Sequence, residues 1–214
     1  MVVQNELDIS QTVNDRILYL SGDIDNANVA EVCKQILSII DYDRKCADKY
    51  RNYTIQPIQL YVQSFGGSIN DMWALIDIIE SSGTPIITYC SGYCMSAAAL
   101  IFLAGHIRCM HKHSTMMFHQ MTVGNVAKFK DFELDQARFE IMHKDMLKYI
   151  KKHTKLPKKF YKAFDERKED VYLDAKKCLK YGICDEVVEN ASWREELLGK
   201  MYSSENTGTE DVNE

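Results

Sequence analysis

The sequence predicts an α/β fold with parallel strands joined by right-handed crossovers. Short apolar segments alternate with segments whose apolar residues recur every three or four positions, which is the order of strands and helices in such folds. The segment Pro85–Cys90 is apolar throughout, as expected of a central strand buried on both faces. With 214 residues, 46% of them hydrophobic, the chain is large enough for one domain with its own core.

The first strand is expected at Arg16–Ser21, ending at Gly22. A helix should begin near Asn26, because an apolar stripe with helical spacing starts there and continues to Ile40. The following segment, residues 41–57, is polar and irregular. It indicates either a long loop or a frayed helix end.

A second strand, Ile58–Val62, leads into the sequence Ser64-Phe-Gly-Gly-Ser68, which is typical of a tight turn. Ser68 and Asp71 have the spacing of a capping box, so a helix is expected over residues 69–82. After the central strand, Gly92 should turn the chain, and Ser96–Ala104 should form a helix of small residues. Two short strands joined by a His-rich turn are expected between residues 107 and 120.

The C-terminal part of the chain contains the longest predicted helix, Lys128–Thr154, which has one amphipathic stripe. Pro157 should open a shorter helix that ends near residue 164. A strand is expected at Val171–Leu173, followed by a helix that Asp174 caps and that Gly182 ends.

Composition excludes several classes of protein. The net charge is −5, and the last twelve residues hold four acids and no base, so the rest is nearly neutral and has no nucleic-acid footprint. The uncharged stretch from Ser81 to Gly105 contains Ser, Thr, Pro and Gly and does not predict a membrane span. The N-terminus does not resemble a signal peptide, and the seven scattered cysteines indicate reduced thiols in the cytoplasm.

Three segments carry candidate chemistry. Ser96 stands at a helix start, where N–H groups can stabilise an oxyanion, although it could instead serve only as an N-cap. His119 ends an apolar strand and could act as a general base or remain a hydrogen-bonded core histidine. Gly66 and Gly67 could bring backbone N–H groups to a ligand or form an ordinary turn.

Taken together, these segments resemble the proteolytic subunits of the Clp protease, the ClpP family. The similarity extends from Arg16 to Glu189, with every motif in the family's order. The matching segments are Ser64–Ser68 (Ser-Pro-Gly-Gly in the family), Gly92–Ser96 (Gly-Gln-Ala-Ala-Ser), Met117–Gln120 (Met-Ile-His-Gln), Glu169–Ala175 (Arg-Asp-x-Phe-Leu-Ser-Ala) and Tyr181–Asp185 (Tyr-Gly-Leu-Val-Asp).

The resemblance implies a serine endopeptidase without cofactor or metal. Its nucleophile would be Ser96, its general base His119 and its orienting acid Asp170. The N–H groups of Gly67 and Ala97 would form the oxyanion hole. The implied fold is a crotonase-like spiral of strand–strand–helix units with a protruding handle helix.

The family also implies an assembly and a domain layout. Two heptameric rings would enclose a chamber, joined through residues 123–129 and the long helix, and a AAA+ unfoldase would feed unfolded proteins into it. We expect a short N-terminal segment at residues 1–15, a peptidase domain at 16–190 and an acidic C-terminal extension at 191–214, disordered at its end.

Some residues depart from the family pattern. Phe65 and Met121 replace prolines, which alters loop stiffness more than chemistry. Glu169 replaces an arginine that takes part in contacts between rings, so ring pairing is less firmly implied than the triad. The segment before Arg16 is shorter than the family's axial segment, and the stretch at residues 41–57 is longer.

Other sites and functions remain open. Four metal-ligand side chains cluster in sequence and could hold a structural zinc, or form an exposed polar turn: His106, Cys109, His111 and His113. Cys94 could be a nucleophile, but no base is evident for it. Near the predicted acid, Asp165, Glu166, Glu169 and Asp174 are interpreted as a solvated face. The alternative functions are a crotonase-type acyl-CoA enzyme, an ATP-independent peptidase and a silent ring subunit.

Overall fold

The computed structural model of the chain describes residues 16–122 and 129–189, and its centre is a seven-stranded sheet. The strands are β1 (Ile17–Ile24), β2 (Ile58–Gly67), β3 (Ile86–Met95), β4 (Ile107–His111), β5 (Thr115–Phe118), β6 (Val171–Asp174) and β7 (Glu186–Val188). The main order is β1-β2-β3-β4-β7, and β5 pairs with both β3 and β6. Every pairing is parallel except β5–β6, which confirms the predicted α/β class.

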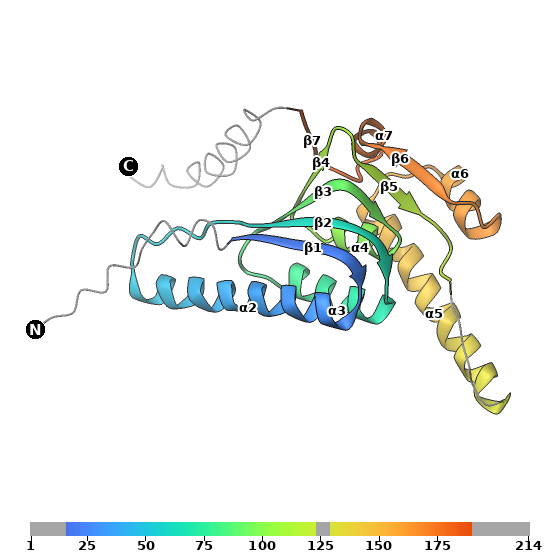
Figure 1. Ribbon diagram of the computed structural model, residues 1–214, viewed down its shortest axis with the longest axis horizontal. Helices are drawn as coiled ribbons and strands as arrows, with labels where there is room; N and C mark the ends of the chain where they lie inside the picture. The colour runs from blue at the N-terminus through green and yellow to red at the C-terminus, as the bar shows by residue number, and fades with distance from the viewer. Residues whose placement is uncertain (1–15, 123–128, 190–214) are drawn as a thin grey trace, which may run out of the picture.

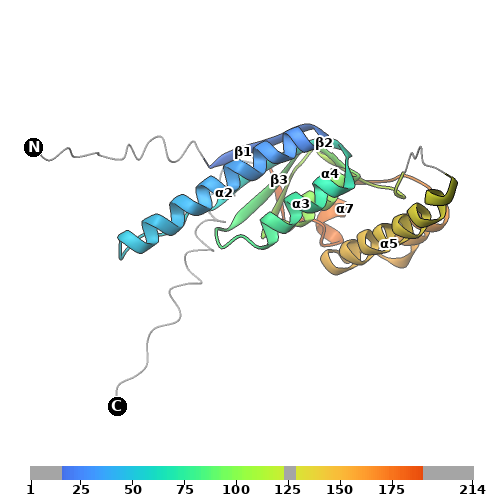
Figure 2. The ribbon, with the colours of Figure 1, turned by 90° about the horizontal axis from the view of Figure 1, so that it is seen from below.

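Helices cover one face of this sheet and the end where β5 and β6 lie (Figure 1). They are α2 (Asn26–Lys49), α3 (Ile69–Glu80), α4 (Ala97–Leu103), α5 (Phe129–His153), α6 (Lys158–Tyr161) and α7 (Ala175–Lys180), with a π-helical turn, η1 (Lys162–Glu166). Figure 1 shows α2 and α3 below the sheet and α5 running away from it, and Figure 2 shows the same arrangement from below. No helix of the described ranges is long and apolar enough to cross a membrane.

Helix α2 is longer than expected, because its polar second half contributes Asp43 to a buried ion pair with Arg16. The Asp43 carboxylate, 1% exposed, bonds the guanidinium of Arg16 (Nη1 to Oδ2, 3.1 Å). The hydroxyls of Tyr53 (2.6 Å) and Thr84 (2.8 Å) donate to the same carboxylate. The prediction of a loop from residue 41 was therefore wrong up to Lys49, and the frayed helix end was the closer reading. Asp43 in this polar stretch is therefore buried with its charge compensated by hydrogen bonds, and is not exposed to solvent.

Strands β2 and β3 also continue beyond their predicted ends. Residues 64–67 of the expected turn are the last part of β2, with Ser68 as the N-cap of α3, and Gly92 lies within β3 with a φ of 80°. The capping prediction holds in part. Ser68 Oγ accepts from Asp71 N (3.3 Å), but Ser68 N donates to Ile24 O (2.7 Å) and not to Asp71. The hydrogen bond from Ser68 N to Ile24 O therefore replaces the one that the Asp71 side chain would accept in a full capping box.

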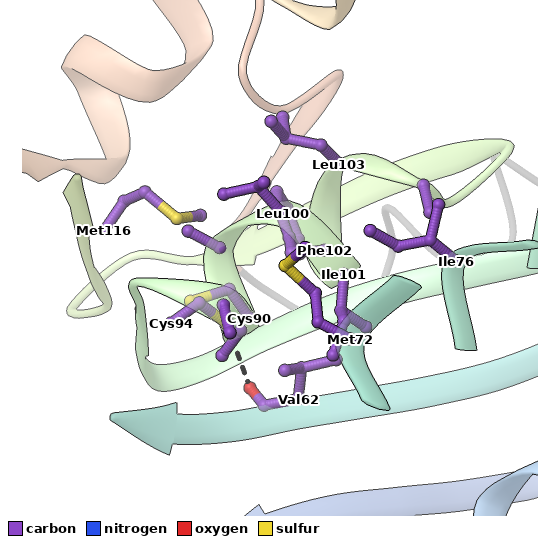
Figure 3. Packing of buried hydrophobic residues seen from close by; sticks show 14 of the residues in the cluster. Val62, Met72, Ile76, Cys90, Cys94, Leu100, Ile101, Phe102, Leu103 and Met116 are labelled. Carbon is purple, nitrogen blue, oxygen red and sulfur yellow. Dashed lines mark hydrogen bonds between the residues drawn. The ribbon is translucent and has the colours of Figure 1, made fainter. Parts of the chain in front are cut away.

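Helix α4 forms the centre of the core, and all seven of its residues are buried. Figure 3 shows its side chains between Met72 and Ile76 of α3 and the strand residues Val62, Cys90 and Cys94. Every cysteine is free and all except Cys33 are buried, which confirms the prediction of reduced thiols packed as small hydrophobes.

Helix α5 matches its predicted limits, and among its described side chains, residues 135–153, the buried ones lie toward the C-terminal end. Met146 and Ile150 are buried, whereas Phe139 and Met142 of the same stripe are partly exposed and Ile141 is 60% exposed. Only the C-terminal part of the described stripe therefore packs into the core of the chain, and Phe139 and Met142 remain partly exposed. The rest of the handle region, residues 123–128, lies outside the described residues, as do the predicted segments 1–15 and 191–214.

The end of the chain follows the prediction closely. Pro157 precedes α6, and the expected short helix continues as the π-helical turn η1. Asp174 caps α7 by accepting from Lys177 N (2.8 Å), and Gly182 follows with a φ of 61°. The three-residue strand β7 was not predicted, because a segment this short carries no periodic pattern.

Candidate active site

Strands β3 and β5 bring Ser96 and His119 together. The two strands are parallel neighbours, and Met95 pairs with Met117 near their carboxyl ends. Ser96 follows β3 directly, and His119 follows β5 directly. As a result, Ser96 Oγ and His119 Nε2 lie 2.7 Å apart, within hydrogen-bond distance. This geometry is what a nucleophile and its general base require.

The backbone at Ser96 is strained and firmly held. Its φ of 54° and ψ of −124° are unusual for a residue with a side chain, and such conformations cost about 1–3 kcal/mol. Ser96 N donates to Met117 O (3.0 Å), and the buried helix α4 follows at once. The side chain makes no capping hydrogen bond to α4, so the alternative that Ser96 is only an N-cap is wrong.

Two glycines allow the end of β2 to lie against this turn. A Cβ on Gly66 would stand 2.7 Å from Ser96 Cβ and 3.1 Å from Ala97 N, so no side chain fits there. A Cβ on Gly67 would stand 2.3 Å from Ile24 O. Sequence reasoning selected Gly67 for the oxyanion hole. The contact between Gly66 and Ser96 was not predicted. The only sequence signal for it was the pair of consecutive glycines, Gly66 and Gly67.

Asp170 faces His119 in register but does not bond it. Val171 of β6 pairs with Phe118 of β5 in an antiparallel ladder, so the next residue on each side is Asp170 opposite His119. Asp170 is exposed, and within the described ranges no hydrogen bond joins it to His119. The structure therefore brings Ser96 and His119 together, and it leaves the side chain of Asp170 exposed without a hydrogen bond to His119.

The neighbouring acids are mostly engaged elsewhere. Asp165 Oδ1 lies 2.7 Å from Nε2 of His143. The Glu169 carboxylate bonds Arg167 (2.6 Å), which lowers its pKa, and the pKa of Asp174 is lowered by the backbone N–H it caps. Glu166 is exposed. The interpretation of a solvated face holds for Glu166, Glu169 and Asp174 but not for the half-buried Asp165, and none of the four lies opposite the base in register.

The cysteine alternative does not fit the structure. Cys94 is fully buried, and its Sγ donates to Val62 O (3.2 Å). Burial and the nearby Cys90 raise the pKa of the Cys94 thiol well above its ordinary value. A buried thiol with a raised pKa is a poor nucleophile.

The four predicted metal-ligand residues do not converge. His106 Nδ1 accepts from Ile86 N (3.1 Å), and His111 Nδ1 lies 3.2 Å from Cys90 O, so both rings bond the backbone of β3. Cys109 is fully buried on β4. Among the residues that the structure describes, no group of three or more His, Cys, Asp or Glu side chains is arranged to hold a metal ion.

Comparisons with known proteins point to one family. The sequence pattern described as "Clp protease" matches residues 4–191. The ATP-dependent Clp protease proteolytic subunit 2 of Chlamydia pneumoniae is 28% identical over 184 residues, which cover 85% of each chain. The proteolytic subunit 1 of Rhodococcus jostii is 29% identical over 180 residues, covering 82% of this chain and 76% of the other.

A solved structure supports the fold. A mutant of ClpP1 from Listeria monocytogenes superposes with a TM-score of 0.70 at 20% identity, covering 86% of this chain and 96% of that one. At this level of identity the likeness concerns the fold alone. It confirms the expected crotonase-like architecture, and the protrusion of α5 agrees with the expected handle (Figure 1).

Proposed function

The chain belongs to the Clp protease family, and from this premise we propose that it is a serine endopeptidase in which Ser96 attacks the peptide carbonyl. The observation that carries this proposal is the 2.7 Å contact between Ser96 Oγ and His119 Nε2. Membership of this family does not favour a crotonase-type acyl-CoA enzyme, and the intact Ser96–His119 pair argues against a silent ring subunit.

The proposed reaction uses the three residues in distinct roles. His119 Nε2 takes the proton of Ser96 Oγ as the oxygen attacks, and later passes it to the leaving amine. Water then hydrolyses the acyl-enzyme with the same histidine as base. The oxyanion of each tetrahedral intermediate would face the N–H groups of Gly67 and Ala97.

Asp170 is the proposed orienting acid. The β5–β6 ladder supports this role, since its last pair is Phe118 with Val171 and one further step of pairing would set Asp170 opposite His119. A carboxylate that accepts from Nδ1 fixes the tautomer with an unprotonated Nε2. The exposed side chain must therefore turn toward His119 in the active form.

We also propose a ring assembly that works with a AAA+ unfoldase. Homologues carry the name "ATP-dependent Clp protease proteolytic subunit". Partly exposed Phe139 and Met142 and exposed Ile141 leave apolar surface on α5, which a second copy can bury. We expect heptameric rings that pair through α5 into a tetradecamer, acting in the cytoplasm on unfolded proteins or peptides. The free cysteines support a reducing compartment.

Two measurements test these proposals. A fluorophosphonate probe should label wild-type protein at Ser96, as peptide mapping by mass spectrometry would show, and should not label His119→Ala. Failure to label the wild type, with acyl-CoA turnover instead, would contradict a serine peptidase. Light scattering across a dilution series should give seven or fourteen times 24.7 kDa. An active monomer would contradict the ring while leaving the peptidase intact.

A further inference from the structure

Lysines gather where α5, α6 and α7 meet (Figure 1). Residues 151–163, which contain the end of α5 and all of α6, hold six lysines and no acid. Helix α7 adds Lys176, Lys177 and Lys180 and also contains no acid. Like charges at this density repel one another, so an anion that binds among them would stabilise the folded chain.

Three of these lysines converge around a pair of aromatic rings. Phe160 of α6 and Tyr181, which follows α7, pack edge to face with ring centroids 5.2 Å apart. Lys159 Nζ lies 5.2 Å from the centre of the Phe160 ring, and Lys180 Nζ lies 5.7 Å from that of Tyr181. Lys155, between α5 and α6, donates its backbone N–H to Tyr181 O (2.7 Å). We refer to Lys155, Lys159 and Lys180 as the lysine cluster.

Among the described residues, no acid forms an ion pair with the lysine cluster, and all three of its side chains are exposed. The acids that flank α7, Asp174 and Asp185, are paired with Lys177 and Arg108 instead. Asp165, the first acid after α6, bonds a histidine of α5. The charges of the cluster are therefore available to an anion from outside the described part of the chain.

The C-terminal extension follows shortly after the lysine cluster and carries the complementary charge. The side chain of Lys155 lies 3.5 Å from the position that a Cβ on Gly182 would take, and β7, which soon follows, spans only about 10 Å. Residues 203–214 hold four acids and no base. An unstructured chain of about 20 residues has a root-mean-square span of about 25 Å, so these acids can reach back to the cluster.

We propose that residues 203–214 bind to the lysine cluster of the same chain and cover it. Attachment to the same chain sets an effective concentration in the millimolar range, so ion pairs that are individually weak suffice. A nucleic acid fits less well, because the whole chain has a net charge of −5 and repels it. The contact should weaken as salt is added, since the Debye length is only about 8 Å at physiological ionic strength.

The first test measures binding of a fluorescein-labelled peptide with the sequence of residues 203–214, by fluorescence anisotropy at low salt. The full chain, in which the extension already occupies the cluster, should bind this peptide roughly tenfold more weakly than a variant truncated after Tyr202. Adding Lys155→Gln, Lys159→Gln and Lys180→Gln to the truncated variant should reduce binding to background, because the amides keep the size of the side chains but not their charge.

The matched control removes the same charge from exposed lysines outside the cluster. Lys34→Gln, Lys49→Gln and Lys112→Gln, combined in the truncated variant, should leave peptide binding unchanged. Thermal unfolding of each variant checks that the fold is retained.

The second test uses a carbodiimide, which joins a carboxylate directly to a lysine in contact with it. In the full chain, mass spectrometry should find crosslinks between residues 203–214 and the lysine cluster. Co-expression of the full-length glutamine variant with the truncated wild-type sequence allows such crosslinks only between chains, and there they should be absent. Neither test depends on the proposed peptidase activity.

Four results would overturn the proposal. One is equal affinity of the peptide for the full chain and the truncated variant. Another is an equal loss of binding in the control with three substitutions outside the cluster. Crosslinks between the co-expressed chains would place the extension on a neighbouring copy. Finally, tighter binding of the full chain to single-stranded DNA than of the truncated variant to the peptide would assign the cluster to a nucleic acid.

Discussion

Ser96 and His119 lie at the ends of buried strands, whereas Asp170 lies on an exposed segment that follows a π-helical turn. Strand residues next to the pair, such as Cys94 and Phe118, are at most 1% exposed, and their packing leaves the nucleophile and base little freedom. Residues 166–170 are all exposed. The core of the chain therefore fixes the proposed nucleophile and base, whereas the position of the proposed acid depends on what orders a surface segment.

Two hydrogen bonds through Asp165 link the segment after His119 to helix α5. His143 Nε2 of α5 lies 2.7 Å from Asp165 Oδ1, and Gln120 Nε2 donates to Asp165 O (3.2 Å). Gln120 follows His119 directly, and Asp165 lies in the turn before the acid-bearing segment. Helix α5 is therefore connected to the segment after His119 through Asp165.

The largest loss of activity is expected from substitutions of the buried Ser96–His119 pair. Ser96→Ala should reduce peptide hydrolysis by a factor on the order of 10⁶, because the nucleophile is lost while alanine fits a helix start already rich in alanine. Steady-state assays on a fluorogenic peptide measure this. The control Cys94→Ala should remain active, since that thiol is buried. Retention of more than roughly a tenth of the activity by Ser96→Ala would show that the nucleophile is misassigned.

Substitution of the exposed Asp170 should lower activity less, but still strongly. Asp170→Asn should lower kcat by about 10⁴, because an amide stabilises the wrong imidazole tautomer. Glu169→Gln and Asp174→Asn are matched controls, since the first is paired with Arg167 and the second keeps a capping oxygen. Equal losses from all three would mean that none of them is the specific partner of His119.

The link between the two halves should have an intermediate effect. His143→Ala and Asp165→Ala each remove the same hydrogen bond, worth about 1.4 kcal/mol, so each should lower kcat/KM by roughly tenfold. The double variant should lose no more than either single one, because both changes break one contact. Lys144→Ala, exposed on the same helix, is the control. Fully additive losses in the double variant would show that the contact does not act as a unit.

The smallest effect on activity is expected far from the site, at Arg16 and Asp43. Burial opposes ionisation of Asp43, but the hydrogen bonds from Arg16, Tyr53 and Thr84 hold its pKa below the ordinary value. The folded state therefore binds a proton less readily than the unfolded chain. This stabilisation is fully present above the unfolded pKa of about 3.9 and is lost as the pH falls through the lower folded pKa.

Thermal unfolding measures this contribution. Asp43→Asn should be destabilised at pH 7 by about 3–5 kcal/mol, because it leaves the Arg16 guanidinium buried and unpaired, while the folded variant should keep its kcat at low temperature. The difference in Tm between wild type and variant should narrow as the pH approaches 3. A difference that stays constant from pH 7 to pH 3 would mean that the Asp43 charge contributes nothing.

Local patterns in the sequence determined the order of strands and helices and the residues that cap the helices. They also indicated Ser96 and His119 as candidate site residues. Ser68 and Asp174 cap the helices that they were predicted to cap, because the capping hydrogen bond spans only three residues. Ser96 could be selected because it stands at the start of a predicted helix, and His119 because it ends a segment whose apolar residues predict a strand. The class of fold followed from the alternation of the same local signals.

Tertiary structure alone decided the features that depend on partners distant in sequence. The polar half of α2 is helical because Asp43 meets Arg16, 27 residues earlier, and no local pattern encodes that pairing. Strand bulges set the ring of Phe65 on β2 against that of Tyr93 on β3, and they arise from unequal residue counts on paired strands, which become visible only when the strands are in register. The position of Asp170 follows the same rule. Its place opposite His119 comes from the β5–β6 ladder, and its side chain, left in solvent, is oriented by nothing within its own segment.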